Sequence, residues 1–172
     1  GYAACGQPQR TVMKTSRTGG PALLDLGARA AAAGWQQAWF EYNAERVRRG
    51  EPLPEDDRAA DWTFLLRLGH DAAALVIGCD WGAASLALAR RCRRVRALDA
   101  SGEKIAFLNA RITQQGVTNL EPAMAPHRLP ECFEGGPFDL IVLRDIPAGW
   151  PTNLSALLSA LKPALKPEGA LF

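Results

Sequence analysis

Consecutive apolar residues fill two short segments of the chain, 72–77 and 95–98, and predict strands that are buried on both faces of a sheet. Between them, Ala83 to Cys92 carries leucines and small residues at helical spacing, which favours a helix packed closely on that sheet. Further strands are expected at 121–126, within 138–145 and at the end of 161–172, and further helices at 101–115 and 153–166, the last one ended or kinked by Pro163. This alternation predicts an α/β fold with a parallel sheet.

The region before the first strand has a different pattern. Residues 1–20 show no periodicity and are expected to form a flexible arm. Two helical segments follow, 21–49 with interruptions near Gly27 and Gly34, and 55–69, separated by a turn. Their recurring apolar positions are expected to be buried: Leu24, Ala28, Ala31, Trp35, Trp39, Tyr42 and Val47 in the first segment, and Trp62, Leu65 and Leu66 in the second. The chain thus divides into an arm (1–20), a helical extension (21–70) and an α/β core (71–172).

The bend after the first strand, Gly78-Cys-Asp-Trp-Gly82, is called the glycine turn below. Its two glycines can adopt backbone angles closed to other residues and carry no side chain, so a ligand can lie directly on the main chain where the next helix begins. The second strand ends in Asp99 beside this turn. A carboxylate in that place can accept hydrogen bonds from both ribose hydroxyls of an adenosine-like ligand.

These residues resemble the first motif of the class I S-adenosylmethionine-dependent methyltransferases, in which an acid and one further residue precede Gly-x-Gly-x-Gly. The outer glycines align, whereas Asp80 stands at the middle glycine and Val76 at the leading acid. Residues 138–145 are similar to the family's fourth-strand motif, and residues 161–172 to the helix end, turn and fifth strand that follow it. The resemblance implies a Rossmann-like, doubly wound, mostly parallel sheet with helices on both faces. It also implies S-adenosylmethionine as cofactor and S-adenosylhomocysteine as product.

The resemblance assigns candidate site residues as well. Two residues after the fourth strand are expected beside the transferred methyl group: Asp145 would orient or deprotonate an acceptor, and Arg144 would hold an anionic one, although both can equally serve as caps of neighbouring loops. The residues expected to bind the cofactor are Gly78, Cys79, Asp80, Gly82, Asp99, Ala100, Met124 and Ala125.

The departures from the motif leave a second function open. Asp80 places negative charge near the cofactor's own carboxylate, and repulsion across ~4 Å costs about 1 kcal/mol in water and several if partly buried. The alternative is a catalytically inactive, methyltransferase-like module that binds a partner. A nicotinamide or flavin oxidoreductase fits less well, because Asp80 and Ser85 occupy its second and third glycine positions.

Composition and charge narrow the function classes further. The formal net charge of +2 is too balanced for a dedicated polyanion binder, and the arginine run at 90–96 follows a helix whose carboxyl end favours positive charge, so nucleic acid is not the favoured partner. Trp35, Trp39 and Trp62 could form an acceptor wall, but an aromatic stripe at helical spacing favours core packing. The acceptor, a small molecule or a protein, is not identified by any motif.

The cysteine pattern and the hydropathy bear on location. The four cysteines lack Cys-x-x-Cys spacing, so neither a metal site nor a disulfide framework is indicated. No apolar run approaches the roughly 20 residues of a membrane span, and a cytoplasmic protein is expected. The methyltransferase domain continues beyond its fifth strand. The chain is therefore expected either to be truncated there or to have a sheet edge that a partner chain covers.

Overall fold

The computed structural model describes residues 25–129 and 133–172. The arm predicted at 1–20 and the start of the helix predicted from residue 21 lie outside the described residues. In the described part of the chain, no helix has the length and apolar character that a membrane crossing requires.

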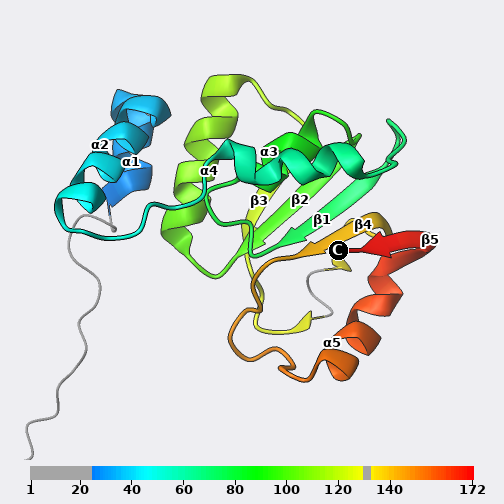
Figure 1. Cartoon of the computed structure of the whole chain (residues 1–172). Coiled ribbons are helices and arrows are strands. Elements are labelled where there is room, and N and C mark those ends of the chain that lie inside the picture. Colours follow the sequence, from blue (N-terminus) through cyan, green and yellow to red (C-terminus); the bar gives the residue numbers. More distant parts are fainter. Residues whose placement is uncertain (1–24, 130–132) are drawn as a thin grey trace, which may run out of the picture.

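One parallel sheet of five strands forms the centre of the molecule, in the order β3-β2-β1-β4-β5 (Figure 1). The order turns back at β1, since β2 and β3 lie on one side of it and β4 and β5 on the other. Where a parallel sheet reverses in this way, the loops after the two central strands diverge and leave a crevice at their carboxyl ends. The strands are β1 (Ala73–Ile77), β2 (Arg94–Asp99), β3 (Leu120–Met124), β4 (Phe138–Leu143) and β5 (Leu165–Leu171).

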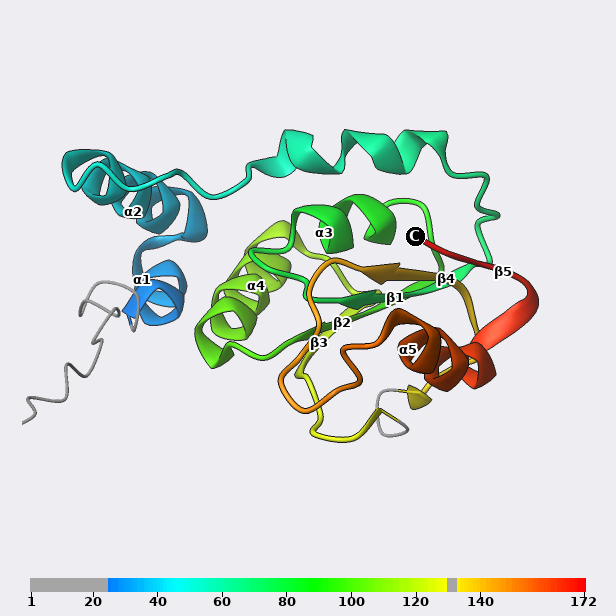
Figure 2. The same ribbon diagram turned by 60° about the horizontal axis from the view of Figure 1, so that its bottom comes forward.

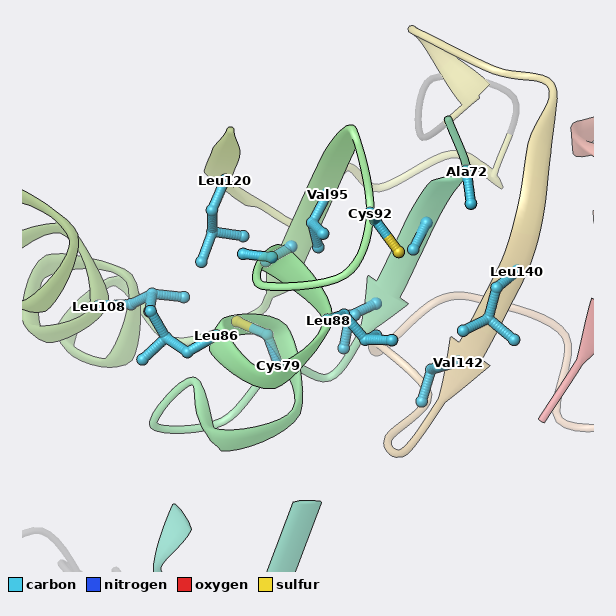
Figure 3. Packing of buried hydrophobic residues seen from close by; sticks show 14 of the residues in the cluster. Ala72, Cys79, Leu86, Leu88, Cys92, Val95, Leu108, Leu120, Leu140 and Val142 are labelled. Carbon is cyan, nitrogen blue, oxygen red and sulfur yellow. The ribbon is translucent and has the colours of Figure 1, made fainter. Parts of the chain in front are cut away.

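Helices cover both faces of the sheet, as predicted (Figure 2). Helices α3 (Ala83–Ala89) and α4 (Gly102–Gln115) pack on one face, where Leu86, Leu88 and Leu108 meet Val95 and Val142 of the strands (Figure 3). Helix α5 (Leu154–Leu161) packs on the other face through Leu157 and Leu161. The predicted α/β, Rossmann-like fold is confirmed.

Two helices of the extension, α1 (Leu26–Ala33) and α2 (Trp35–Arg48), lie beside α4. They are separated at Gly34, whose φ is +96°, as predicted. The interruption predicted near Gly27 is wrong, because Gly27 lies in the first turn of α1. A Cβ atom at Gly27 would stand 2.5 Å from the Cβ of Ala106, so this glycine lets α1 approach α4 closely.

The predicted buried face is confirmed at Tyr42, with Trp35 and Trp39 packed beside it, and is wrong at three other positions. Ala28 and Ala31 are exposed, and Val47 is 61% exposed. The break at Gly34 resets the helical phase, so a single period running through 21–49 assigns the wrong face to α1. The buried residues are Leu26, Gly27, Ala30, Ala38 and Tyr42.

The second predicted segment forms a 3-10 helix, η2 (Asp57–Leu65), with Asp56 as its cap. A 3-10 helix has three residues per turn, so the buried residues Ala60 and Thr63 share its inner face. Leu65, predicted to be buried, is 84% exposed. The prediction is therefore wrong at Leu65, whereas Trp62 and Leu66 pack against the core as predicted.

Two helices end earlier than predicted. Helix α3 stops at Ala89 instead of Cys92, and α5 stops at Leu161 instead of continuing to Lys166. Pro163 lies in the short 3-10 turn η4 (Lys162–Ala164), which confirms that this proline ends the helix. Leu165 consequently begins β5.

Candidate functional site

The glycine turn has the backbone conformation that its sequence predicts. The φ angles of Gly78 and Gly82 are +74° and +94°. A Cβ at Gly78 would stand 2.5 Å from the backbone nitrogen of Asp145, and one at Gly82 would stand 2.4 Å from Cδ1 of Leu108. Both glycines are therefore required, one for the approach of the segment after β4 and the other for the packing of α4.

Hydrogen bonds fasten the glycine turn to the end of β2. The backbone nitrogens of Gly78 and Cys79 donate to the carbonyl of Leu98 at 2.8 and 2.9 Å. The backbone nitrogen of Asp80 donates to Oδ2 of Asp99 at 2.9 Å, while Oδ1 of Asp99 accepts from the backbone nitrogen of Ser101 at 2.9 Å. Asp99 is only 6% exposed, and these two bonds fix the orientation of its carboxylate.

A pocket of about 350 Å³ opens at the carboxyl ends of β1, β2 and β4. This volume lies in the range of roughly 300–1,000 Å³ that small-molecule sites occupy. The structure brings five of the predicted residues together in it: Gly78, Asp80, Asp99, Arg144 and Asp145. It adds four residues that were not predicted: Leu53, Pro54, Glu55 and Lys104.

The other predicted residues do not line this pocket. The Cys79 side chain is fully buried in the core under α3. Burial, reinforced by the charges of Asp99 and Asp80, raises the pKa of its thiol far above the ordinary value, so the thiol is protonated at neutral pH. Ala100 follows β2, Met124 is the last residue of β3 and Ala125 follows it; these three residues lie outside the pocket wall, and Met124 is 51% exposed.

The two residues after β4 have defined partners. The Arg144 guanidinium forms an ion pair with Glu55, which belongs to the connection between α2 and η2. Asp145 is exposed, and its Oδ1 accepts from the backbone nitrogen of Ile146 at 2.9 Å. Asp145 therefore lines the pocket with a second oxygen that can accept a proton or a hydrogen bond, whereas Arg144 already has an anionic partner.

Lys104 is one of the four lining residues that the sequence analysis missed. Its Nζ lies 2.7 Å from Oδ1 of Asp80 and 4.0 Å from Oδ2 of Asp99. Burial alone would lower the pKa of this amine, but the hydrogen bond and charge of Asp80, with Asp99 and Asp145, raise it above the ordinary value. The sequence did contain one indication of a cation at this site, namely Asp80, because a part-buried acid in a glycine turn is stabilised by a nearby positive charge.

Trp81 connects the glycine turn to the extension. It is 6% exposed and lies 5.5 Å, between ring centroids, from both Trp39 and Tyr42, and 5.6 Å from Phe107. Trp35 contacts Phe107 edge to face. The predicted aromatic stripe is therefore core packing in α2, and its function is to hold the glycine turn against α4.

Arg111 reinforces the same connection. This residue is 4% exposed, donates to the carbonyl of Trp81 at 3.1 Å and pairs with Asp57 at 2.8 Å. Its guanidinium lies 4.2 Å from the centroid of the Trp35 ring. A second cavity of about 290 Å³ is lined by Arg111, the three tryptophans at 35, 39 and 81, and the acidic start of η2.

Comparison with known proteins identifies the domain. Residues 74–169, more than half of the chain, match a family model described as "Methyltransferase domain". No curated protein sequence matches the chain at a significant level.

Solved structures share the fold. The precorrin-8w decarboxylase of Methanobacterium thermoautotrophicum is 27% identical, with a TM-score of 0.56 over 70% of this chain and 63% of that one. PKMT2 of Rickettsia typhi, in complex with AdoHcy, is 25% identical, with a TM-score of 0.51 over 67% of this chain and 23% of that one. The precorrin-6y C5,15-methyltransferase of Geobacter metallireducens, 20% identical with a TM-score of 0.51 over 62% and 55% of the two chains, supports the fold alone.

The chain thus spans less than two thirds of the length of each of these structures. The family match includes the glycine turn, Asp99 and all five strands, apart from the first residue of β1 and the last two residues of β5. The chain belongs to the methyltransferase domain family and has the class I fold, whose cofactor is S-adenosylmethionine.

Proposed function

We propose that this chain binds S-adenosylmethionine in the pocket at the carboxyl ends of β1 and β2 and transfers its methyl group to an acceptor at the pocket mouth. The observation that carries the proposal is the position of Asp99. Its carboxylate is buried, fixed by two backbone donors, and lines the pocket beside Gly78. Such a carboxylate has the chemistry to accept hydrogen bonds from both hydroxyls of a ribose.

The charge of the pocket supports this ligand. Four carboxylates, of Glu55, Asp80, Asp99 and Asp145, face two cations, of Lys104 and Arg144, so the lining has an excess of two negative charges. S-adenosylmethionine carries a net positive charge because of its sulfonium. A dinucleotide carries a negatively charged pyrophosphate instead, so the same lining disfavours the nicotinamide and flavin cofactors.

The bound sulfonium supplies an already activated methyl group, so the protein mainly has to align an acceptor and exclude water. We assign this alignment to Asp145, an exposed residue that lines the pocket and whose Oδ2 is not used in its bond to Ile146. Arg144 would hold an anionic acceptor only if Glu55 gave up its ion pair. A neutral or cationic acceptor therefore fits the mouth better than an anionic one, whether it is a small molecule or a group on a protein.

One observation favours the alternative, a methyltransferase-like binding module without catalysis. Three backbone nitrogens of the glycine turn, those of Gly78, Cys79 and Asp80, already donate within the protein. They offer no free donor to a ligand carboxylate. In this alternative the domain would act as a binding or assembly subunit, and its pocket would bind neither cofactor nor product.

Two further partner predictions bear on either function. Within the described residues β5 pairs only with β4, and Leu171 is 37% exposed, so pairing with a partner chain at this edge stays a prediction. In the arginine run, Arg91 donates to the carbonyls of Thr63 and Leu66, and Arg96 pairs with Glu134. These two side chains serve the fold, which leaves less of the run for a nucleic acid.

The test is calorimetric titration of the protein with S-adenosylmethionine, S-adenosylhomocysteine and NADH. We expect micromolar binding of the first two, and a loss of about tenfold or more in Asp99→Ala because a buried partner of the ribose is removed. Asp61→Ala, at an exposed aspartate of η2, is the matched control and should bind as the wild type does. Binding of NADH alone would overturn the proposal, and binding of none of the three would favour the non-catalytic module.

A further inference from the structure

Asp80 occupies the place of the middle glycine and also takes a glycine-like conformation. Its φ is +50°, and among the described residues it is the only one other than glycine with a positive φ. Aspartate tolerates the left-handed region better than most residues. The backbone of the glycine turn is therefore kept, and what changes is the presence of a carboxylate inside the cofactor pocket.

This carboxylate creates a problem for Asp99. The backbone nitrogen of Asp80 bonds Oδ2 of Asp99, so the two acids are held next to each other at the same side of the pocket. Asp145 adds a third acid to the lining. Carboxylates held this close repel each other, which disfavours the fixed orientation of Asp99 that a ribose requires.

Lys104 lies close enough to both acids to offset their repulsion. It lies in the first turn of α4, where its backbone nitrogen donates to the cap residue Ser101, and its side chain returns over the strand end. Its Nζ contacts Asp80 at 2.7 Å, faces Asp99 at 4.0 Å and lies 5.8 Å from the centroid of the Trp81 ring. The amine is thus a single cation shared by two acids, seated beside an aromatic face.

We propose that Lys104 is a positioning residue of the cofactor site: it is the shared cation that offsets the repulsion between Asp80 and Asp99 and keeps both side chains in place, so that a turn with an acid in it still recognises a ribose. The inference rests on the proposed function of the pocket. The Lys104 and Asp80 side chains are each 29% exposed, and a part-exposed ion pair of this kind contributes only modestly to folding. The effect of Lys104 therefore falls on the ligand more than on the fold.

Methylthioadenosine is the probe that isolates this effect, because it has the ribose but neither the sulfonium nor the amino-acid charges of the cofactor. We expect Lys104→Met to weaken its binding about tenfold or more by calorimetry, since two unshielded acids then face the ribose. Methionine is a good helix former, so α4 should be preserved. In the Asp80→Gly background, where the second acid is absent, the same Lys104→Met change should cost less than about threefold.

Lys162→Met, at an exposed lysine of η4, is the matched control for loss of a positive charge and should leave binding unchanged. Thermal unfolding of each variant checks that the fold is kept. Equal weakening by Lys104→Met in both backgrounds, or no weakening in either, would overturn the inference. If the wild-type protein binds neither methylthioadenosine nor S-adenosylhomocysteine, the proposed function itself fails, which is a distinct result.

Discussion

Two regions of the molecule, called the buried half (around β1 and α3) and the exposed half (around β5 and α5), differ sharply in how they are covered. In the half around β1 and α3, all five residues of β1 and six of the seven residues of α3 are buried. In the half around β5 and α5, no residue of β5 is buried, and only Leu157 and Leu161 of α5 are. The first half carries Asp99 and the glycine turn, and the second begins with Arg144 and Asp145.

This difference suggests a division of labour. The cofactor is recognised by a few fixed groups, so its half of the site benefits from a rigid, aromatic support around Trp81. The acceptor differs from one methyltransferase to the next, and its side of the site borders the more exposed half, where surface residues can change at little cost to the core. Substitutions in the two halves should therefore have very different consequences.

The largest expected effect comes from Trp81. Trp81→Ala removes the ring that Trp39, Tyr42 and Phe107 surround, and loss of such a buried aromatic side chain costs about 3–5 kcal/mol. Chemical denaturation measures the free energy of unfolding. Phe172→Ala is the comparison in the exposed half: this ring is 58% exposed and stacks on Trp62, so its removal should cost about 1 kcal/mol or less. Similar losses in the two variants would break the comparison.

The next effect separates packing from backbone strain. Gly78→Ala places a methyl group 2.5 Å from the backbone nitrogen of Asp145 at a positive φ, whereas Gly149→Ala, at φ +90°, meets nothing within 4 Å. We expect about 1–2 kcal/mol of destabilisation at Gly149 from the left-handed conformation alone, and a larger loss at Gly78. Gly78→Ala should also weaken cofactor binding, because it separates the loops after β1 and β4. Equal destabilisation would mean that the close approach at Gly78 carries no energy.

The same contrast explains what the sequence could predict. The apolar runs at 72–77 and 95–98 predicted β1 and β2 to within a residue or two, because a strand buried on both faces leaves little choice of residue. Gly78, Gly82 and Asp99 were found because local backbone geometry and position at a strand end determine them. These features depend on a few neighbouring positions in the chain.

The errors fall where distant contacts decide the structure. Lys104 was missed because its role depends on Asp80, 24 positions earlier in the chain. Leu65 was assigned to a buried stripe because apolar spacing alone does not distinguish a 3-10 helix from an α-helix. Leu165 was placed in a helix because the strong leucine pattern continues past Pro163, whose effect on the chain direction decides the boundary.

The smallest effect tests the ion pair that links β1, β4 and β5. Asp139 accepts from Lys166 Nζ at 2.8 Å and from the backbone nitrogen of Ala73 at 2.8 Å. Burial opposes the charge of this carboxyl, but these bonds lower its pKa below the ordinary value. A lowered pKa in the folded state means that the contribution to stability is present above the ordinary aspartate pKa of about 3.9 and is lost as the pH falls through the lower folded value.

Asp139→Asn should therefore destabilise the protein at neutral pH by only about 0.5–1 kcal/mol, because the pair is part exposed. The difference from the wild type should shrink as the pH drops below 4 or so, when the wild-type carboxyl also becomes neutral. Denaturation curves at neutral and acidic pH measure this, with Asp71→Asn, an exposed aspartate before β1, as the control. A difference that stays constant with pH would show that Asp139 acts through its shape and its bond to Ala73 and not through its charge. The strand pairing of the exposed half would then not depend on the ion pair with Lys166.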